Sequence, residues 1–139
     1  MLLASCDPVE NEENETAIVP VQAVTASIGG QLFTAASITH EVLDGIHVFI
    51  CTSATLDVLT IKISDLAVGD HAINFDDPTI TYYTGGNLFD QTPMATGTIN
   101  ISEQTAYRIN GSFETVVRDI AVSGQELTVT GGLFTQLEY

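Results

Sequence analysis

The chain has very few cationic residues. Its three cations, Lys62, Arg108 and Arg118, stand against 18 Asp and Glu residues, so that the net charge is −15 over 139 residues. A nucleic-acid-binding surface needs clustered basic side chains, and so does electrostatic binding to anionic lipid headgroups. The composition therefore predicts a protein that binds no nucleic acid and is not drawn to a membrane by charge.

Cysteine and long apolar runs are also scarce. The chain has two cysteines, Cys6 and Cys51, and no apolar run near the ~20 residues that a membrane-spanning helix needs. Cys51 lies in the apolar segment Val48-Phe49-Ile50-Cys51-Thr52, which predicts a small buried side chain. A disulfide between the two cysteines remains an alternative if Cys6 carries no lipid.

Recognisable catalytic and metal-binding motifs are missing as well. His40, His47 and His71 are scattered, and none stands in an H-x-H or H-x-x-x-H spacing, so a zinc site built from them with Cys51 is disfavoured. No G-x-S-x-G element is present, and no two of the thirteen acids after residue 15 stand out as a catalytic pair. We therefore assign no catalytic residue and expect a protein that is not an enzyme.

The motif that is present lies at the amino end. Leu3-Ala4-Ser5-Cys6 has the form of a lipobox, in which small residues precede a cysteine that becomes lipidated. Only Met1 and Leu2 come before it, whereas a complete signal peptide has a basic region and an apolar stretch of ~7–15 residues. The pattern predicts a truncated lipoprotein signal over residues 1–6, with Cys6 as the lipid-bearing residue.

An acidic segment follows the lipobox. Asp7 to Glu15 hold five carboxylates and no cation, a composition too polar to form a packed core. We expect a disordered spacer over residues 7–18 and a single domain over residues 19–139. The segment resembles that of Bacteroidetes-type lipoproteins, in which acids after the lipidated cysteine, here Asp7, Glu10, Glu12 and Glu13, are associated with export to the cell surface. The resemblance implies a cell-envelope, outer-membrane lipoprotein that faces the outside of the cell.

The remainder of the chain shows the alternating pattern of β-strands. Leu59-Thr60-Ile61-Lys62-Ile63 has one apolar and one polar face, and the dipeptides Gly29-Gly30 and Asp44-Gly45 are typical of tight turns. Residues 35–43 are ambiguous and could hold a short helix, and Gly131-Gly132 is expected to separate the last two strands. Eight to ten short strands predict an all-β domain, an antiparallel sandwich or a barrel.

Four short segments combine glycine with apolar residues: Ala26–Ala35, Gly97–Ile101, Asn110–Phe113 and Leu127–Phe134. They follow approximately the pattern I-x-G-x-x-F-x-A, then G-T-[IV]-x-I, G-x-F and V-T-x-G-x-F. In this the chain resembles a family of small Bacteroidetes-type lipoproteins with a β domain of unknown function. The resemblance implies the fold but brings no substrate and no catalytic residue.

Glycine and phenylalanine recur together in these segments. We expect the glycines at turns or bulges and the rings in the core. These residues are Gly29, Gly111 and Gly131, and Phe33, Phe113 and Phe134.

Two groups of residues are candidate sites, a set of loop acids and a set of aromatic residues. Calcium binds hard oxygen ligands, which the loop acids Asp70, Asp76, Asp77 and Asp90 could supply, although Asp76-Asp77-Pro78 also reads as a simple turn.

Tyr82, Tyr83, Phe89 and Met94 lie in or beside the glycine-containing segment 84–96. Aromatic rings in such a loop could stack on a sugar or anchor a protein. We therefore expect a non-enzymatic module that binds a glycan or an envelope protein; the alternative is a calcium-dependent carbohydrate binder or hydrolase that uses the acids near Asp76.

Overall fold

A computed structural model describes residues 21–92, 95–121 and 124–139. These residues form ten strands, all paired antiparallel, and within them no helix is long and apolar enough to cross a membrane. The strands are β1 (Ala23–Ile28), β2 (Gln31–Leu43), β3 (Ile46–Ser53), β4 (Val58–Ile63), β5 (Gly69–Ala72), β6 (Thr79–Thr84), β7 (Asn87–Asp90), β8 (Gly97–Gln104), β9 (Arg108–Asp119) and β10 (Glu126–Glu138). The expected all-β class is confirmed.

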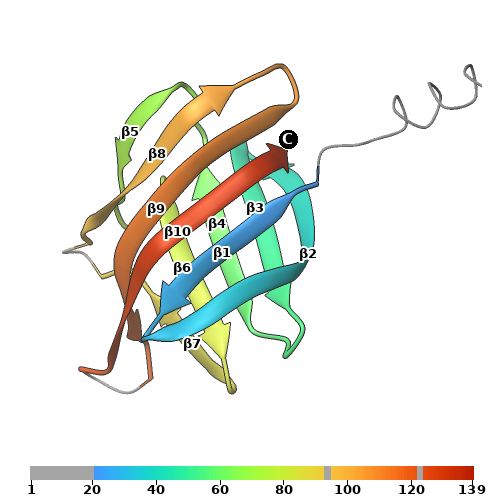
Figure 1. Ribbon diagram of the computed structural model, residues 1–139. Coiled ribbons are helices and arrows are strands. Elements are labelled where there is room, and N and C mark those ends of the chain that lie inside the picture. Colours follow the sequence, from blue (N-terminus) through green and yellow to red (C-terminus); the bar gives the residue numbers. More distant parts are fainter. Residues whose placement is uncertain (1–20, 93–94, 122–123) are drawn as a thin grey trace, which may run out of the picture.

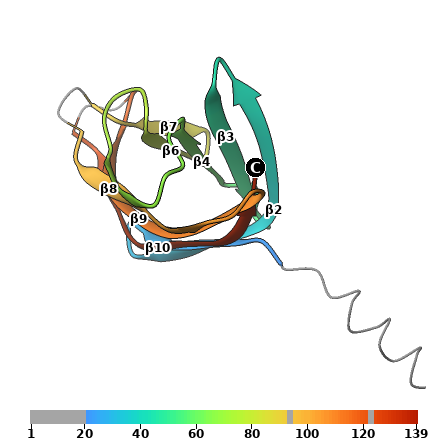
Figure 2. The same cartoon turned by 90° about the horizontal axis from the view of Figure 1, so that it is seen from above.

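Eight of the strands close into a barrel. The order is β10-β1-β2-β3-β4-β6-β7-β9, and β9 pairs back onto β10 to complete the ring (Figure 1). Strands β8 and β5 continue outward from β9, along the edge that β9 also uses to pair with β7 (Figure 2). The structure thus selects the barrel over the sandwich.

Turn chemistry sets the first two hairpins. Gly29 and Gly30 have φ values of 59° and 83°, and Asp44 and Gly45 have 53° and 82°. Two successive positive φ angles are the requirement of the two-residue turn that matches the twist of antiparallel strands. The pairs Ile28 with Gln31 and Leu43 with Ile46 flank these turns, as the sequence predicts.

Alternation directs the apolar residues inward. On β4, Leu59, Ile61 and Ile63 are buried, whereas Thr60 and Lys62 lie on the outer face. Side chains from all around the barrel join one buried cluster that fills its interior. The expectation that three phenylalanines enter the core is confirmed, and these are Phe33, Phe113 and Phe134.

Two expectations for local structure are wrong. Residues 35–43 form no short helix but continue β2, because β3 pairs with this segment from Leu43 back to Ala35 across a bulge. Gly131-Gly132 makes no turn; it lies inside β10, where the register shifts between Val129 and Gly132. In both places the pairing partner, which comes from elsewhere in the chain, overrides the local preference.

Segment 84–96 also contains more regular structure than expected. Asn87–Asp90 forms β7, which pairs with β6 on one side and β9 on the other. Just after it, the buried side chain of Gln91 donates hydrogen bonds to the carbonyl of Ile80 (3.1 Å) and to Oγ1 of Thr115 (2.9 Å). Gln91 therefore links β6 to β9 at the point where β9 changes its partner from β8 to β7.

Two glycines allow β9 and β10 to pack against aromatic rings. A Cβ atom built on Gly132 would lie 2.5 Å from the ring of Phe113 and 2.6 Å from its carbonyl oxygen. A Cβ atom on Gly111 would lie 2.4 Å from the ring of Phe134. The two rings are stacked with centroids 6.3 Å apart, so each ring fills the space beside a glycine on the opposite strand.

We predict that Gly132→Ala destabilises the fold by about 1–3 kcal/mol. The added methyl group would overlap the buried ring of Phe113 and its backbone carbonyl oxygen. Thr135→Ala, an exposed position on the same strand, is the control and should change stability by less than about 0.5 kcal/mol. Urea unfolding of the three proteins measures the difference. Equal stability of Gly132→Ala and the control would show that the close approach is not required.

Candidate functional site

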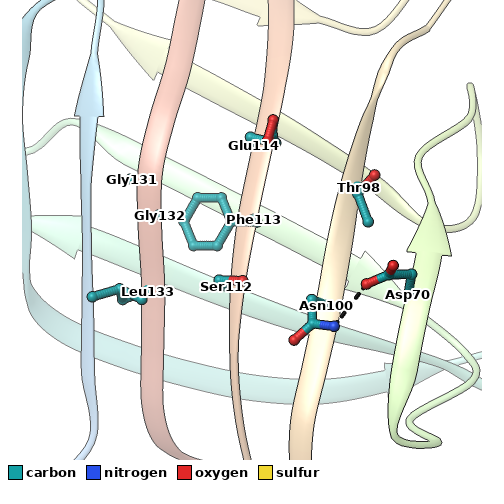
Figure 3. Close-up of a pocket in the computed structure, with 9 residues that line it drawn as sticks. All are labelled: Asp70, Thr98, Asn100, Ser112, Phe113, Glu114, Gly131, Gly132 and Leu133. Atoms are coloured by element: carbon teal, nitrogen blue, oxygen red, sulfur yellow. Dashed lines mark hydrogen bonds between the residues drawn. The ribbon is translucent and has the colours of Figure 1, made fainter.

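A groove of about 450 Å³ lies on the outer face of the barrel, over β5, β8, β9 and β10 (Figure 3). Most of the side chains around it are polar. Its lining consists of Asp70, Thr98, Asn100, Ser112, Phe113, Glu114, Gly131, Gly132 and Leu133.

The strand registers explain why these residues meet. Asp70, Asn100, Ser112 and Leu133 are successive partners across the four strands. Alternation on β8 places Thr98 beside Asn100 on the outer face, with the intervening isoleucines turned inward. The row is therefore a direct consequence of period-two patterning and antiparallel pairing.

The hollow lies beside the bulge of β10. Gly131 has a φ of 60° there, and no atom lies within 4 Å of the position that a Cβ on it would take. The ring of Phe113 lies beneath Gly132 and is almost fully buried. The floor of the groove is therefore backbone and ring edge, and its rim is formed by the longer side chains of β5, β8 and β9.

The electrostatic character of the groove is acidic and hydrogen-bonding. Asn100 donates its Nδ2 hydrogen to Oδ1 of Asp70 at 2.7 Å, which leaves its carbonyl oxygen for another partner (Figure 3). Two carboxylates, Asp70 and Glu114, line the groove, and no Lys or Arg is among its described lining residues. Such a surface disfavours anions and offers hydroxyl, amide and carboxylate partners to a polar ligand.

Both arginines are engaged elsewhere. Arg108 pairs with Glu138 at 2.8 Å and Arg118 with Glu126 at 2.5 Å, each directly opposite on β9 and β10. Both are therefore cross-strand ion pairs. Exposed pairs of this kind contribute about 0.2–1 kcal/mol each.

The structure separates the three aromatic residues expected to bind a ligand. Tyr82 and Phe89 are 8% and 3% exposed and belong to the core, where the ring of Tyr82 meets that of Phe33 edge-on at 6.0 Å. Tyr83 is 45% exposed on the outer face of β6. Burial, together with the Asp57 carboxylate, raises the pKa of Tyr82. Met94 lies outside the described residues.

The four acids expected to bind calcium do not converge. Asp70 accepts from Asn100, Asp77 accepts the backbone N–H of Ser64 at 2.9 Å, and Asp90 accepts that of Gln91. In the described part of the chain, no three side chains of the His, Cys, Asp and Glu types are grouped as metal ligands. The calcium site stays a prediction.

The turn at Asp76-Asp77-Pro78 has a local explanation. Oδ1 of Asn74 accepts the backbone N–H groups of Asp76 and Asp77 at 2.7 and 2.8 Å, and its Nδ2 donates to the carbonyl of Asp77. The segment therefore adopts the turn that the sequence offered as the alternative to a metal loop.

Of the two cysteines, the structure describes Cys51 and not Cys6. Cys6 lies outside the described residues, as does the acidic segment 7–18. Cys51 is fully buried inside the barrel, as expected, and burial raises the pKa of its thiol to about 12. A thiol with that pKa is almost entirely protonated near neutral pH and is a poor nucleophile.

Residues 21–138 match the family described as "Domain of unknown function (DUF6252)". The chain belongs to the DUF6252 family. No curated protein and no solved structure matches the chain. The matched DUF6252 segment begins just before β1 and ends with β10, so it contains every strand of the barrel and every residue of the groove.

Sequence reasoning did not find the groove of this DUF6252 domain. The alternation of Thr98 and Asn100 with isoleucines was visible, and so was Gly131-Gly132. What was missing was the pairing of β8 with β9 and of β9 with β10, which alone brings these segments to one surface.

We predict that the Cys51 thiol of the folded DUF6252 domain resists alkylation. In a Cys6→Ala protein, where Cys51 is the remaining cysteine, iodoacetamide at pH 8 should leave it unmodified, because a pKa of about 12 makes its thiolate fraction about a thousandfold smaller than that of an ordinary thiol. Mass spectrometry before and after unfolding in guanidinium gives the comparison. Rapid labelling of the native protein would show that the barrel admits the reagent.

Proposed function

We propose that this protein is a non-enzymatic, lipid-anchored module of a bacterial cell envelope that binds an uncharged, hydroxyl-rich ligand, a glycan chain, in the groove over β5, β8, β9 and β10. The observation that carries the proposal is the outward-facing polar row Asp70, Asn100 and Ser112, which ends at Leu133, beside a glycine floor. The barrel interior is filled with apolar side chains, which favours a surface site over an internal one.

The chemistry of the groove supports a glycan. Sugar hydroxyls both donate and accept hydrogen bonds, and the groove supplies carboxylates, an amide and the hydroxyls of Thr98 and Ser112. Leu133 is 54% exposed at its edge and offers an apolar contact to the C–H face of a sugar ring. Without a cation in the lining, anionic ligands are disfavoured.

The anchor part of the proposal rests on the sequence. Leu3-Ala4-Ser5-Cys6 has the form of a lipobox, and the acids Asp7, Glu10, Glu12 and Glu13 follow it. Because a second acyl chain makes membrane attachment stable where one does not, a fully lipidated Cys6 would hold the domain at the membrane. The resemblance to Bacteroidetes-type lipoproteins supports an outer-membrane location facing the cell exterior.

We predict that Asn100→Ala weakens binding of such a glycan about tenfold, because one hydrogen-bonded amide, worth about 1.4 kcal/mol at this ratio, is removed. Ser112→Trp, which places a large side chain in the groove, should abolish binding. Thr81→Ala, on the outer face of β6, is the matched control and should bind as the unmodified protein does.

A glycan array followed by calorimetry provides the measurement, with and without calcium. A ligand whose affinity is unchanged by Asn100→Ala and Ser112→Trp would place the site elsewhere. Binding that requires calcium and is lost in Asp77→Ala would favour the calcium-dependent alternative. Binding only to a cationic peptide, weakening with salt, would replace the glycan by a protein ligand.

We predict that Cys6→Ala releases the protein from the membrane fraction of its host, whereas Cys51→Ala, which leaves the lipobox intact, stays attached. Ultracentrifugation of lysates and immunoblotting separate the two cases. If Cys6→Ala still sediments with membranes, the anchor assignment is wrong.

A further inference from the structure

Two histidines that are seven residues apart in the chain meet at one end of the barrel. His40 on β2 and His47 on β3 lie on either side of the Asp44-Gly45 turn. The register pairs His40 with Phe49 and Val42 with His47, so the two imidazoles are diagonal neighbours on the same face of the hairpin. Nε2 of His40 lies 2.9 Å from Nδ1 of His47.

The surrounding rings hold this pair in position. The two imidazoles stack with centroids 5.2 Å apart and planes inclined by 19°. Phe49 packs against His40 at 4.8 Å, and Tyr139 meets His47 edge-on at 5.4 Å. Backbone pairing of Tyr139 with Tyr107 (3.0 Å) fixes the ring that supports His47.

The facing nitrogens can serve as ligands because a neutral imidazole carries a lone pair on one of its two nitrogens. A hydrogen bond between two neutral imidazoles uses one N–H and one lone pair. If the ring that donates moves its proton to its other nitrogen, both facing nitrogens present lone pairs, and no proton is lost to solvent.

We propose that His40 and His47 form a two-histidine chelate for a borderline divalent transition-metal ion, with Zn²⁺ as the reference case and water in the remaining positions. Imidazole is a preferred ligand of zinc, copper and nickel. Two Zn–N bonds of about 2.0–2.1 Å at a tetrahedral angle place the nitrogens ~3.3–3.4 Å apart. To hold the ion, the observed 2.9 Å separation must widen by a few tenths of an ångström, and both rings must turn so that their lone pairs meet at the ion.

The site has open coordination positions. In the described residues no third side chain of the His, Cys, Asp or Glu type completes a ligand group there. Both histidines are half-buried and reach solvent at the hairpin end, where Val42 and Leu43 are exposed. The ion therefore keeps water ligands that an external donor could replace.

The chain supplies its own control. His71, on β5, donates from Nε2 to the carbonyl of Ala67 (2.7 Å) and does not belong to the pair. His71→Gln removes a histidine while leaving the site intact. His40→Gln and His47→Gln each remove one of the two ligands and keep a polar side chain.

The test is titration of the untagged full chain, stripped with a chelator, with ZnCl2 at pH 7.5 in a calorimeter. We expect one ion per chain, affinity at least tenfold lower in His40→Gln and in His47→Gln, and unchanged affinity in His71→Gln. Circular dichroism melts establish that each variant is folded. Zinc binding that is absent, that survives both substitutions, or that falls equally in His71→Gln would overturn the proposal.

A second measurement needs no variant. Nitrogen-15 spectra of the unmodified protein report each imidazole nitrogen separately, and zinc should move Nε2 of His40 and Nδ1 of His47 toward the range of metal-bound nitrogens while the His71 signals stay in place. Equal changes at all three histidines, or none, would also overturn the proposal. Because the groove over β5, β8, β9 and β10 contains neither histidine, loss of glycan binding and loss of zinc binding are independent results.

Discussion

Pairing of β9 with β10 closes the barrel, and the rest of the structure depends on it. β10 pairs with β1 along its other edge, so this contact joins the first strand of the domain to the last two. The two strands approach closely because Gly111 and Gly132 have no side chains where the rings of Phe134 and Phe113 pass. The rings thereby occupy the volume beside the two glycines and keep the core closely packed where β9 meets β10.

Branching at β9 creates the outer surface that we regard as functional. One edge of β9 pairs with β8 through residues 109–115 and with β7 at Arg118 and Asp119. Strands β8 and β5 therefore leave the barrel wall and extend the sheet beyond β9, on the side away from β10. The bulge of β10 then lies within a four-stranded face, and a hollow with polar side chains on its rim lies beside Gly131.

Apolar side chains fill the interior of the barrel, so ligand-binding groups have to lie at its surface. Cys51 and Tyr82 are titratable, but burial raises the pKa of each and keeps both neutral and enclosed. The groups that meet solvent in organised arrangements are the groove residues on the wall and the histidine pair at the end of the β2–β3 hairpin. Net negative charge makes the wall unsuited to anions.

Local chemistry of the chain determined the strand class, the Gly29-Gly30 and Asp44-Gly45 turns, the alternation in β4 and the burial of Cys51, because each depends on residues close together in sequence. Tertiary structure alone decided that the sheet closes, that residues 35–43 are a strand and that Gly131-Gly132 is a bulge. It also brought Asp70 beside Asn100 and His40 beside His47. These outcomes depend on register between strands, and shifting a register by one residue moves every side chain to the opposite face, so alternation within a strand cannot specify which outward residues become neighbours.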